Sequence, residues 1–221
     1  MPTPEPGAAA AYPPDAPPDC PICPRLVAYR AGNRAAHPDW FNGAAPSFGD
    51  PDARLLIVGL APGRTGANRT GRPFTGDYAG LLLYETLLKL GFAEGRYEAR
   101  PDDGLRLVDC MITNAVRCAP PGNKPETAEE ANCRPYLAAR IAALPRLKVI
   151  VTLGDVSRRN VLRALGGKAS DGAAGHGSEF QAGRYWVINS YHCSRLNTNT
   201  GRLTAPMFEA VFERARALLA A

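Results

Sequence analysis

The sequence predicts an α/β fold in which a parallel sheet is covered by helices on both faces. Two observations carry this prediction. Four short runs of apolar residues, each followed by glycine or by polar residues, are typical of strands buried on both faces. Segments with helical periodicity lie between these runs, and such alternation is typical of parallel sheets. The chain has 221 residues, which is enough for one domain with a substantial core.

The N-terminal segment and the composition indicate the domain organisation, the location and the kind of partner. Residues 1–19 are rich in proline and alanine and predict a disordered tail, so that residues 20–221 form a single domain. No signal peptide and no membrane-spanning run is visible, and we therefore expect a cytoplasmic protein. The net charge of +5 weakly indicates an anionic partner.

The elements are justified by their apolar patterns and end signals. The predicted strands are residues 53–60 (ARLLIVGL), 105–116 (LRLVDCMITNAV), 147–154 (LKVIVTLG) and 184–192 (RYWVINSYH). A helix over residues 78–91 ends at a glycine, and the helix that closes the chain has Pro206 near its first turn. Thr127 and Glu130 predict a capping box at the start of a further helix. Two more helices are expected: one follows a short metal-type knuckle within residues 20–36 (CPICPRLVAYRAGNRAA), and one covers residues 157–166 (SRRNVLRALG).

A glycine-rich loop, GLAPGRTGANRTGRPFTGDYAG, follows the first strand. It lacks the lysine of a phosphate-binding loop and the dinucleotide-binding fingerprint, so it is either a flexible turn or a site of another kind. Phe74 offers a flat apolar ring in this polar loop, and Asp77 stands where it caps the next helix or serves catalysis. These two roles of Asp77 are compatible.

Polar residues follow three of the predicted strands. They lie in the glycine-rich loop, in TNAVRC at the end of the second strand, and in HCSRLN after the fourth strand. Ligands of open α/β sheets bind at the carboxyl ends of the strands. The three segments are therefore expected to converge on one site.

Six cysteines in a cytoplasmic protein indicate thiols or metal ligands. Cys20 and Cys23 form a C-x-x-C pair, and Cys118 is followed by Cys133 after 15 positions. These four residues fit zinc or an iron–sulfur cluster, or they are unrelated buried thiols. The missing second C-x-x-C pair favours a [4Fe–4S] cluster. Cys110 is expected in the core and Cys193 in an exposed loop.

Three segments together resemble the signature motifs of the type B, or fifth-family, uracil-DNA glycosylases. They are GLAPGRTGANRTGRPFTGDYAG, TNAVRCAPPGNKP and SYHCSRLNTNTGRLT, and the resemblance extends from about Cys20 to the C-terminal helix. It implies a three-layer α/β/α sandwich around a four-stranded parallel sheet. It also implies a [4Fe–4S] cluster held by Cys20, Cys23, Cys118 and Cys133. The implied activity is excision of uracil, and of other deaminated bases such as hypoxanthine, from DNA.

The resemblance also suggests roles for site residues. The strand-one motif, Gly59, Leu60, Ala61, Pro62 and Gly63, has no carboxylate, which is the mark of type B and moves the catalytic role to Asp77. Phe74 would stack on the flipped base, and Asn114 would hydrogen-bond its edge, unless Asn114 only caps the strand end. His192 would stabilise the negative charge on the leaving base, unless it is an ordinary strand-end histidine. With no lysine in the glycine-rich loop or the third motif, a monofunctional enzyme is expected.

DNA binding is expected to be mainly electrostatic. Arginines that suit phosphate contacts are Arg64, Arg69, Arg72, Arg195 and Arg202. The third motif supplies the expected DNA-binding residues Ser194, Arg195, Leu196, Asn197 and Arg202, with Thr200 nearby. The motif departs from the family at Cys193, where a proline is usual, and the loop loses that fixed backbone angle.

In the favoured reading, the chain is expected to be monomeric and to initiate base excision repair at the nucleoid. Other functions remain open at this stage. One alternative is a glycosylase that prefers another lesion, and a second is an iron–sulfur module that binds damaged DNA without hydrolysis. A zinc hydrolase or deaminase is less favoured, since H-x-E with P-C-x-x-C is absent.

Overall fold

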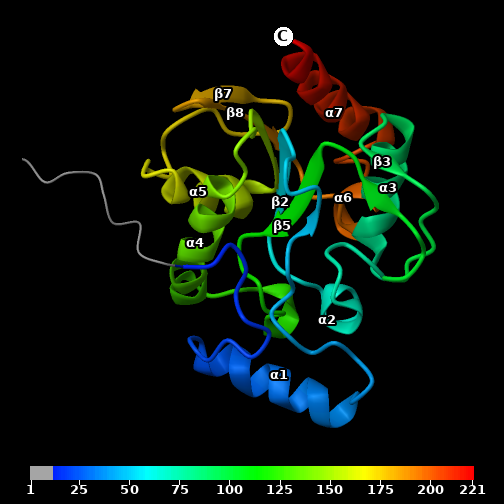
Figure 1. Cartoon of the computed structure of the whole chain (residues 1–221), viewed down its shortest axis with the longest axis vertical. Coiled ribbons are helices and arrows are strands. Elements are labelled where there is room, and N and C mark those ends of the chain that lie inside the picture. The colour runs from blue at the N-terminus through cyan, green and yellow to red at the C-terminus, as the bar shows by residue number, and fades with distance from the viewer. Residues whose placement is uncertain (1–11) are drawn as a thin grey trace, which may run out of the picture.

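The computed structural model describes residues 12–221 and shows a six-stranded sheet between two layers of helices (Figure 1). The strand order is β1-β5-β2-β6-β8-β7. The four inner strands are parallel and confirm the predicted sheet; they are β2 (Leu55–Gly59), β5 (Cys110–Asn114), β6 (Val149–Leu153) and β8 (Tyr185–Ser190). Two antiparallel edge strands extend it, β1 (Phe48–Gly49) and β7 (Glu179–Ala182).

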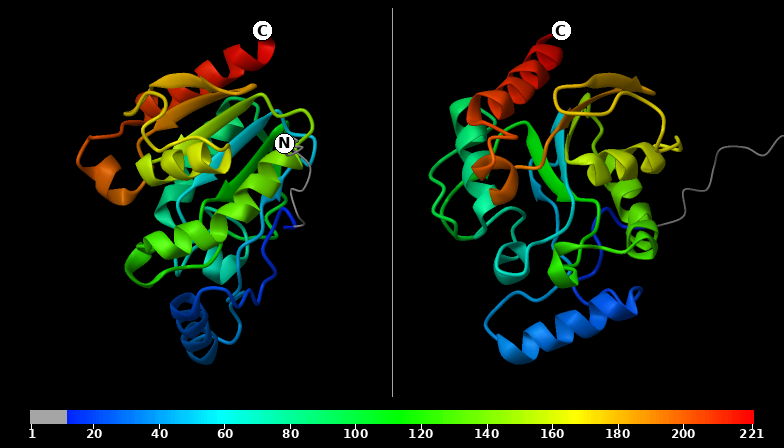
Figure 2. Two further views of the ribbon diagram at one scale, coloured as in Figure 1. Left: turned by 90° about the vertical axis from the view of Figure 1, so that its left-hand side faces the viewer. Right: turned by 180° about the vertical axis from the view of Figure 1, so that it is seen from behind.

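Each inner strand buries side chains on both faces, as continuous apolar runs require. Leu55 and Ile57 of β2 belong to the core under α3 (Tyr78–Lys89) and α7 (Ala205–Ala220), whereas Leu56 and Val58 belong to the opposite core. That second core lies under α4 (Thr127–Ala142) and α5 (Asp155–Ala164). Figure 2 shows the two helical layers on either side of the sheet. The predicted three-layer α/β/α sandwich is confirmed.

Short elements complete the chain. They are α1 (Pro24–Ala36), α2 (Ala67–Thr70), the hairpin of β3 (Ala93–Glu94) and β4 (Arg106–Leu107), the 3-10 turn η1 (Pro121–Asn123) and α6 (Arg195–Asn199). The predicted strand over residues 105–116 is thus divided, because Asp109 adopts a positive φ of 51° between β4 and β5. Within residues 12–221, no helix is both long and apolar enough to cross a bilayer.

The predicted capping box at Thr127 and Glu130 is wrong by one position. The N-cap of α4 is Glu126, whose side chain pairs reciprocally with Glu129. The shift has a physical reason outside the helix: Arg25 donates hydrogen bonds to both carboxylate oxygens of Glu129 at 2.8 and 2.7 Å. A tertiary ion pair therefore decides which residue begins α4.

The end of the molecule opposite the C-terminus is formed by α1 and the segment before it (Figure 2). Residues 1–11 of the expected disordered tail lie outside the described residues. Residues 12–19 instead lie against the domain: Asp15 accepts hydrogen bonds from Arg117 and Ser47 at 2.9 and 2.7 Å, and it also pairs with Arg140. Composition could not reveal this, because the contacts join Asp15 to residues 32 to 125 positions later in the chain.

Candidate active site

A cavity of about 330 Å³ opens at the carboxyl edge of the sheet, where the three polar segments were expected to converge. The glycine-rich loop after β2, the end of β5 and the segment after β8 all contribute to its walls. Residues predicted for the site that line it are Leu60, Ala61, Gly63, Phe74, Asp77, Asn114, His192, Ser194 and Arg195. The cavity is also lined by Arg64, Thr65, Tyr78, Ala79 and Asn123, of which only Arg64 was singled out beforehand.

Asp77 is both the N-cap of α3 and a wall of the cavity. Its side chain accepts a hydrogen bond from the backbone N–H of Gly80 at 3.1 Å. Gly63 and Gly66 lie against the carboxylate, and a Cβ on Gly66 would be 2.9 Å from Asp77 Cγ. Burial raises the pKa of Asp77 above its ordinary value, and the helix N–H groups offset part of that rise. The cap fixes the carboxylate in a site with little water.

Phe74 and Asn114 both lie against Gly59, and they have room there because glycine has no side chain. A Cβ on Gly59 would be 2.6 Å from Phe74 Cζ and would also clash with Asn114 Oδ1. Asn114 Oδ1 is buried and has no hydrogen-bond partner among the described residues. A buried acceptor without a partner is costly, and its position in a cavity wall indicates that a ligand supplies the donor.

His192 stands opposite the phenyl ring of Phe74. The two ring centroids are 6.1 Å apart, with an interplanar angle of 31°. Burial lowers the pKa of His192 below its ordinary value, so the imidazole is neutral at pH 7. The backbone carbonyl of His192 accepts a hydrogen bond from Asn197 Nδ2 at 2.8 Å, which ties the third motif to the histidine.

Cys193 is buried, and the expectation that it is exposed is wrong. It packs in the core cluster with Leu203 and Phe208. Burial raises the pKa of its thiol well above the ordinary range. The residue behaves as a small apolar side chain that anchors the motif from inside. Its neighbours in the chain, His192 and Ser194, are half-buried and line the cavity.

The rest of the third motif forms a short helix, α6, where the sequence suggested a loop. Ser194 caps it by accepting from Asn197 N at 3.5 Å. Leu196 projects from α6 with 73% of its surface exposed. The guanidinium of Arg195 lies 5.0 Å from the centre of the Tyr78 ring. Asn197 and Arg202 line a neighbouring cavity of about 200 Å³, with His192 between the two cavities.

Two further arginines expected at phosphates have partners within the protein. Arg64 lines the cavity and donates from Nε to Asn33 Oδ1 of α1 at 2.8 Å. Arg72 is buried and forms a two-pronged ion pair with Asp103, so its expected phosphate contact is wrong. A guanidinium enclosed in this way cannot reach DNA. Lys124, the lysine of the second motif, is exposed and does not line the cavity.

The four cysteines expected to bind a metal group line one small cavity of about 20 Å³ beneath α1. Backbone and side-chain N–H groups point to their sulfur atoms: Arg117 N donates to Cys133 at 3.2 Å, and Arg30 to Cys118 at 3.6 Å. Burial raises the pKa of Cys118 to about 12 and that of Cys133 to about 11, and neighbouring cysteines add to both shifts.

The donor set therefore has the chemistry of a soft-metal site. Cluster ligands are thiolates, and in an apolar core four neighbouring thiolates would repel one another. The N–H donors around these four sulfur atoms therefore suit an iron–sulfur cluster better than an apolar core. Among the described residues, however, no group of three or more histidine, cysteine or acidic side chains is arranged to hold a metal ion. Cys110 is separate and lies in the core, as predicted.

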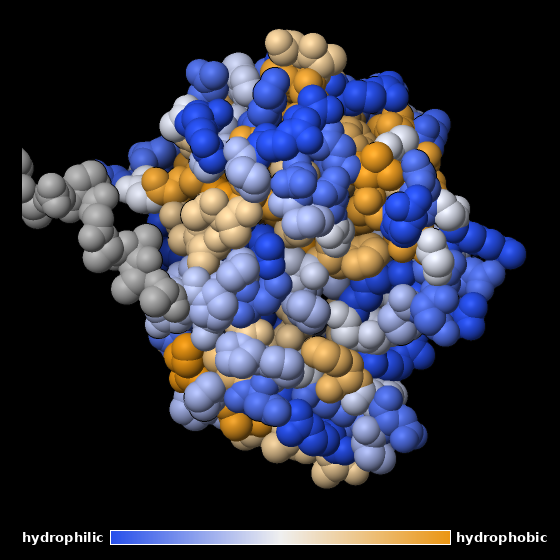
Figure 3. Space-filling model, viewed as in Figure 1, coloured by the Kyte–Doolittle hydropathy of each residue, from blue (hydrophilic) through white to orange (hydrophobic). Residues whose placement is uncertain are grey.

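The surface of the molecule carries both hydrophilic and hydrophobic residues. Seen as in Figure 1, it is mostly hydrophilic, with hydrophobic residues in small groups (Figure 3). Leu196, Leu81 and Tyr78 are among the exposed large hydrophobic residues. Leu196 and Tyr78 belong to the elements that surround the cavity of about 330 Å³, which is where an exposed apolar side chain can have a function.

Comparison with known proteins agrees with this geometry. Residues 46–216 match the family model described as the uracil DNA glycosylase superfamily. The chain is 44% identical to the type-5 uracil-DNA glycosylase of Thermus thermophilus over 207 residues, which are 90% of this chain and 93% of the relative. The type-5 enzyme of Pyrobaculum aerophilum is 41% identical over 90% of this chain and 88% of its own, and the type-4 enzyme of that organism is 36% identical over 57% of each.

The fold and the cavity define an α/β/α protein with a ligand site at the carboxyl edge of its sheet. The chain belongs to the uracil DNA glycosylase superfamily. The enzyme class that the motifs implied, a hydrolase of N-glycosyl bonds, is confirmed.

Proposed function

We propose that this protein is a type-5 uracil-DNA glycosylase that flips uracil and other deaminated bases out of DNA and hydrolyses their glycosidic bonds. It is monofunctional and initiates base excision repair. The observation that carries the proposal is the unpartnered Asn114 Oδ1 in a cavity that also holds Phe74, Asp77 and His192. The name and the high identity of the type-5 relatives support it.

Asn114 selects the base by its hydrogen-bonding edge. Uracil presents an N–H donor beside a carbonyl acceptor, and an amide can accept from the first and donate to the second. Hypoxanthine presents the same pair of groups, because deamination converts an amino group into a carbonyl in both bases. Cytosine and adenine present the reverse order, an amino donor in place of the carbonyl and a bare ring nitrogen in place of the N–H. An Asn114 amide held in one orientation would then face donor with donor and acceptor with acceptor. Phe74 stacks on the flipped base, an interaction worth about 1–3 kcal/mol.

Asp77 and His192 act on the two charges that develop as the bond breaks. The Asp77 carboxylate stabilises the positive charge on the sugar and orients the attacking water. As the new C–O bond forms and the glycosidic C–N bond breaks, the water transfers its proton to Asp77, and the base leaves as an anion. Neutral His192 donates a hydrogen bond to the base oxygen that becomes negative. The backbone of Leu60, Ala61 and Gly63 forms the adjoining wall of the cavity.

DNA is held by the residues around the mouth of the cavity. Arg195, Arg202 and Ser194 meet phosphates, while exposed Leu196 enters the space that the flipped base leaves. Asn197 positions the segment through its bond to the carbonyl of His192. Arg64 and Arg69 contribute positive charge from the glycine-rich loop.

Cys20, Cys23, Cys118 and Cys133 hold a [4Fe–4S] cluster in this proposal. When bound, the cluster links α1 and α4 to the end of the sheet. The protein's own residues prepare the site: Arg30, Arg117 and Asn132 donate hydrogen bonds to sulfur and lower the cost of burying thiolates.

The function is tested with a panel of duplex and single-stranded oligonucleotides that contain uracil, hypoxanthine, cytosine or adenine. Abasic-site formation is scored by alkaline cleavage. We expect product from uracil and hypoxanthine, and none from cytosine or adenine. Tight binding to uracil-containing DNA without abasic sites would instead identify a damage-binding module without hydrolysis, and would overturn the proposal.

A further inference from the structure

Phe74 is held in a backbone conformation that a phenylalanine seldom adopts. Its φ is +53°, in the left-handed region that favours glycine. Such strain persists only where surrounding contacts enforce it, and it is common at ligand sites. Some of the contacts that enforce it come from α3. Others come from a segment outside the three motifs, residues 95–105, which we call the hairpin loop because it joins β3 to β4.

The backbone on either side of Phe74 is fixed by two tyrosine hydroxyls. Tyr97 of the hairpin loop donates to the carbonyl of Phe74 at 3.1 Å, and Tyr84 of α3 donates to the carbonyl of Pro73 at 2.7 Å. The two tyrosine rings stack at 4.5 Å. Gly80 closes the other side, where any Cβ would collide with the carbonyl of Phe74.

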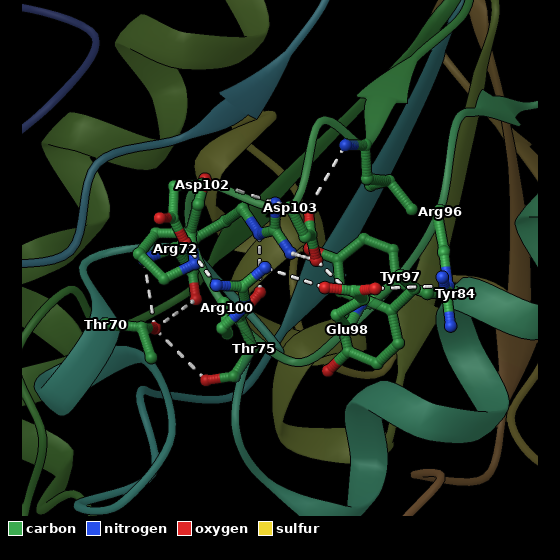
Figure 4. Close-up of polar contacts among 12 residues, drawn as sticks. Thr70, Arg72, Thr75, Tyr84, Arg96, Tyr97, Glu98, Arg100, Asp102 and Asp103 are labelled. Carbon is green, nitrogen blue, oxygen red and sulfur yellow. Dashed lines mark hydrogen bonds and ion pairs between the residues drawn. The ribbon is translucent and has the colours of Figure 1, made fainter.

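The rings of both tyrosines lie next to a buried ion pair between Arg72 and Asp103. Arg72 donates to both carboxylate oxygens of Asp103 at 2.8 and 2.7 Å, as the dashed lines in Figure 4 show. The guanidinium lies 5.5 and 5.8 Å from the ring centres of Tyr84 and Tyr97. Asp103 also accepts the backbone N–H groups of Glu98 and Leu105, and its pKa is held far below the usual range.

A second connection runs from the ion pair to the same turn. Arg72 Nε donates to Thr75 Oγ1 at 2.7 Å, and Thr75 Oγ1 in turn donates to the carbonyl of Pro73 at 3.2 Å. Phe74 therefore lies between two residues that are both tied to the Arg72–Asp103 pair. The exposed side-chain ion pairs of the hairpin loop, such as that of Arg100 with the Glu98 carboxylate, include neither Arg72 nor Asp103 and contribute little.

We infer that Tyr97, supported by the Arg72–Asp103 pair, is a positioning residue that sets the plane of the Phe74 ring for stacking on the flipped base. Tyr97 touches neither the base nor the reacting atoms. It acts through the peptide of Phe74, and its effect therefore depends on the presence of the Phe74 ring. The inference rests on the proposed function, because stacking has meaning only if a base enters the cavity.

Tyr97→Phe tests this with the smallest change available, because the ring still stacks on Tyr84. We expect the single-turnover rate of uracil excision to fall about threefold to tenfold, the effect of one lost hydrogen bond. The KM for uracil-containing DNA should stay within about twofold, since phosphate contacts lie elsewhere. Arg100→Ala, in the same hairpin loop but outside the network, is the matched control and should keep the wild-type rate.

A double-mutant cycle separates positioning from general stabilisation of the fold. In a Phe74→Ala background, Tyr97→Phe should cause no further loss of rate. An equal loss with and without the Phe74 ring would overturn the inference, as would an unchanged rate for Tyr97→Phe in an active enzyme. Absence of uracil excision by the wild type would instead refute the proposed function, and this inference with it.

Discussion

Among single residues, Asp77 is subject to two opposing demands. Its carboxylate caps α3 and faces the cavity, yet burial raises its pKa. A folded-state pKa above the unfolded value means that the group stabilises the fold below the ordinary aspartate pKa. That contribution is lost as pH rises through the folded value. At neutral pH the ionised carboxylate, the form that the proposed catalytic role requires, therefore weakens the fold.

Asp77→Asn should separate these two effects. Asparagine caps a helix about as well as aspartate, so α3 should remain intact. We expect excision of uracil to fall about a hundredfold or more, and the free energy of unfolding at pH 7 to rise. Urea denaturation at pH 7 and near pH 3 measures the second effect, which should vanish at the lower pH. A variant less stable than wild type at pH 7 would contradict the argument.

Residue types and spacing were enough to nominate the cavity residues, because those residues directly follow predicted strands. They were not enough for Arg72 or Cys193. An arginine in a glycine-rich loop looks available to DNA, and only the fold shows that Asp103, 31 positions later, encloses it. A cysteine between histidine and serine looks exposed, and only packing against α7 shows otherwise.

At the scale of elements, the glycine-rich loop owes its course to missing side chains. Gly66 precedes α2 and lies against the carboxylate of Asp77. Gly59 leaves room for the Phe74 ring. The loop is therefore shaped to hold two functional side chains, and flexibility alone does not explain its glycines.

Gly66→Ala should displace Asp77 and lower the excision rate about tenfold to a hundredfold, as small misplacements of catalytic groups do. Gly32→Ala is the matched control. Gly32 lies within α1 with open space around it, and alanine in a helix interior should be neutral or slightly stabilising. Uracil-excision rates and thermal unfolding temperatures of both variants are compared with those of the wild type. Equal activity of the two would show that the loop tolerates a side chain beside Asp77.

The inner strands and the long helices could be predicted because their patterns are long and unbroken. The edge strands could not: β1 has two residues, and β7 has only half-buried or exposed positions. Helix α6 was missed because five residues give too little periodicity. The Ser194 cap was the available signal for it.

Considered as a whole molecule, the protein should bind DNA through charges at the mouth of the cavity. Arg195→Ala should weaken DNA binding and reduce the slope of log K against log salt by about one. Arg184→Ala is the matched control, because Arg184 also stacks on a tyrosine at 5.0 Å but lies in the β7–β8 turn. Fluorescence anisotropy at several salt concentrations measures both. An equal change of slope in the two variants would indicate that only net charge matters.

The cysteine cavity is lined by the segment before α1, the segment after β5 and α4. Losing one of its four thiols should therefore lower the stability of the whole molecule. Cys23→Ser should lower the iron content of the purified protein and its melting temperature. Cys110→Ala, outside the cavity, should lower the melting temperature without loss of iron. Iron analysis and differential scanning calorimetry test both variants. Full iron content in Cys23→Ser would remove Cys23 from the proposed set.

The same cavity imposes an order on biosynthesis. Cys20 and Cys23 precede Cys118 and Cys133 by about a hundred residues, so the two pairs of thiols leave the ribosome at well-separated times. Residues 12–19 also close over Arg117, so the segment translated first must wait for partners translated about a hundred residues later. At roughly 5–20 residues per second, that interval lasts at least several seconds. During this time the first two thiols have no partner thiols and remain open to oxidation.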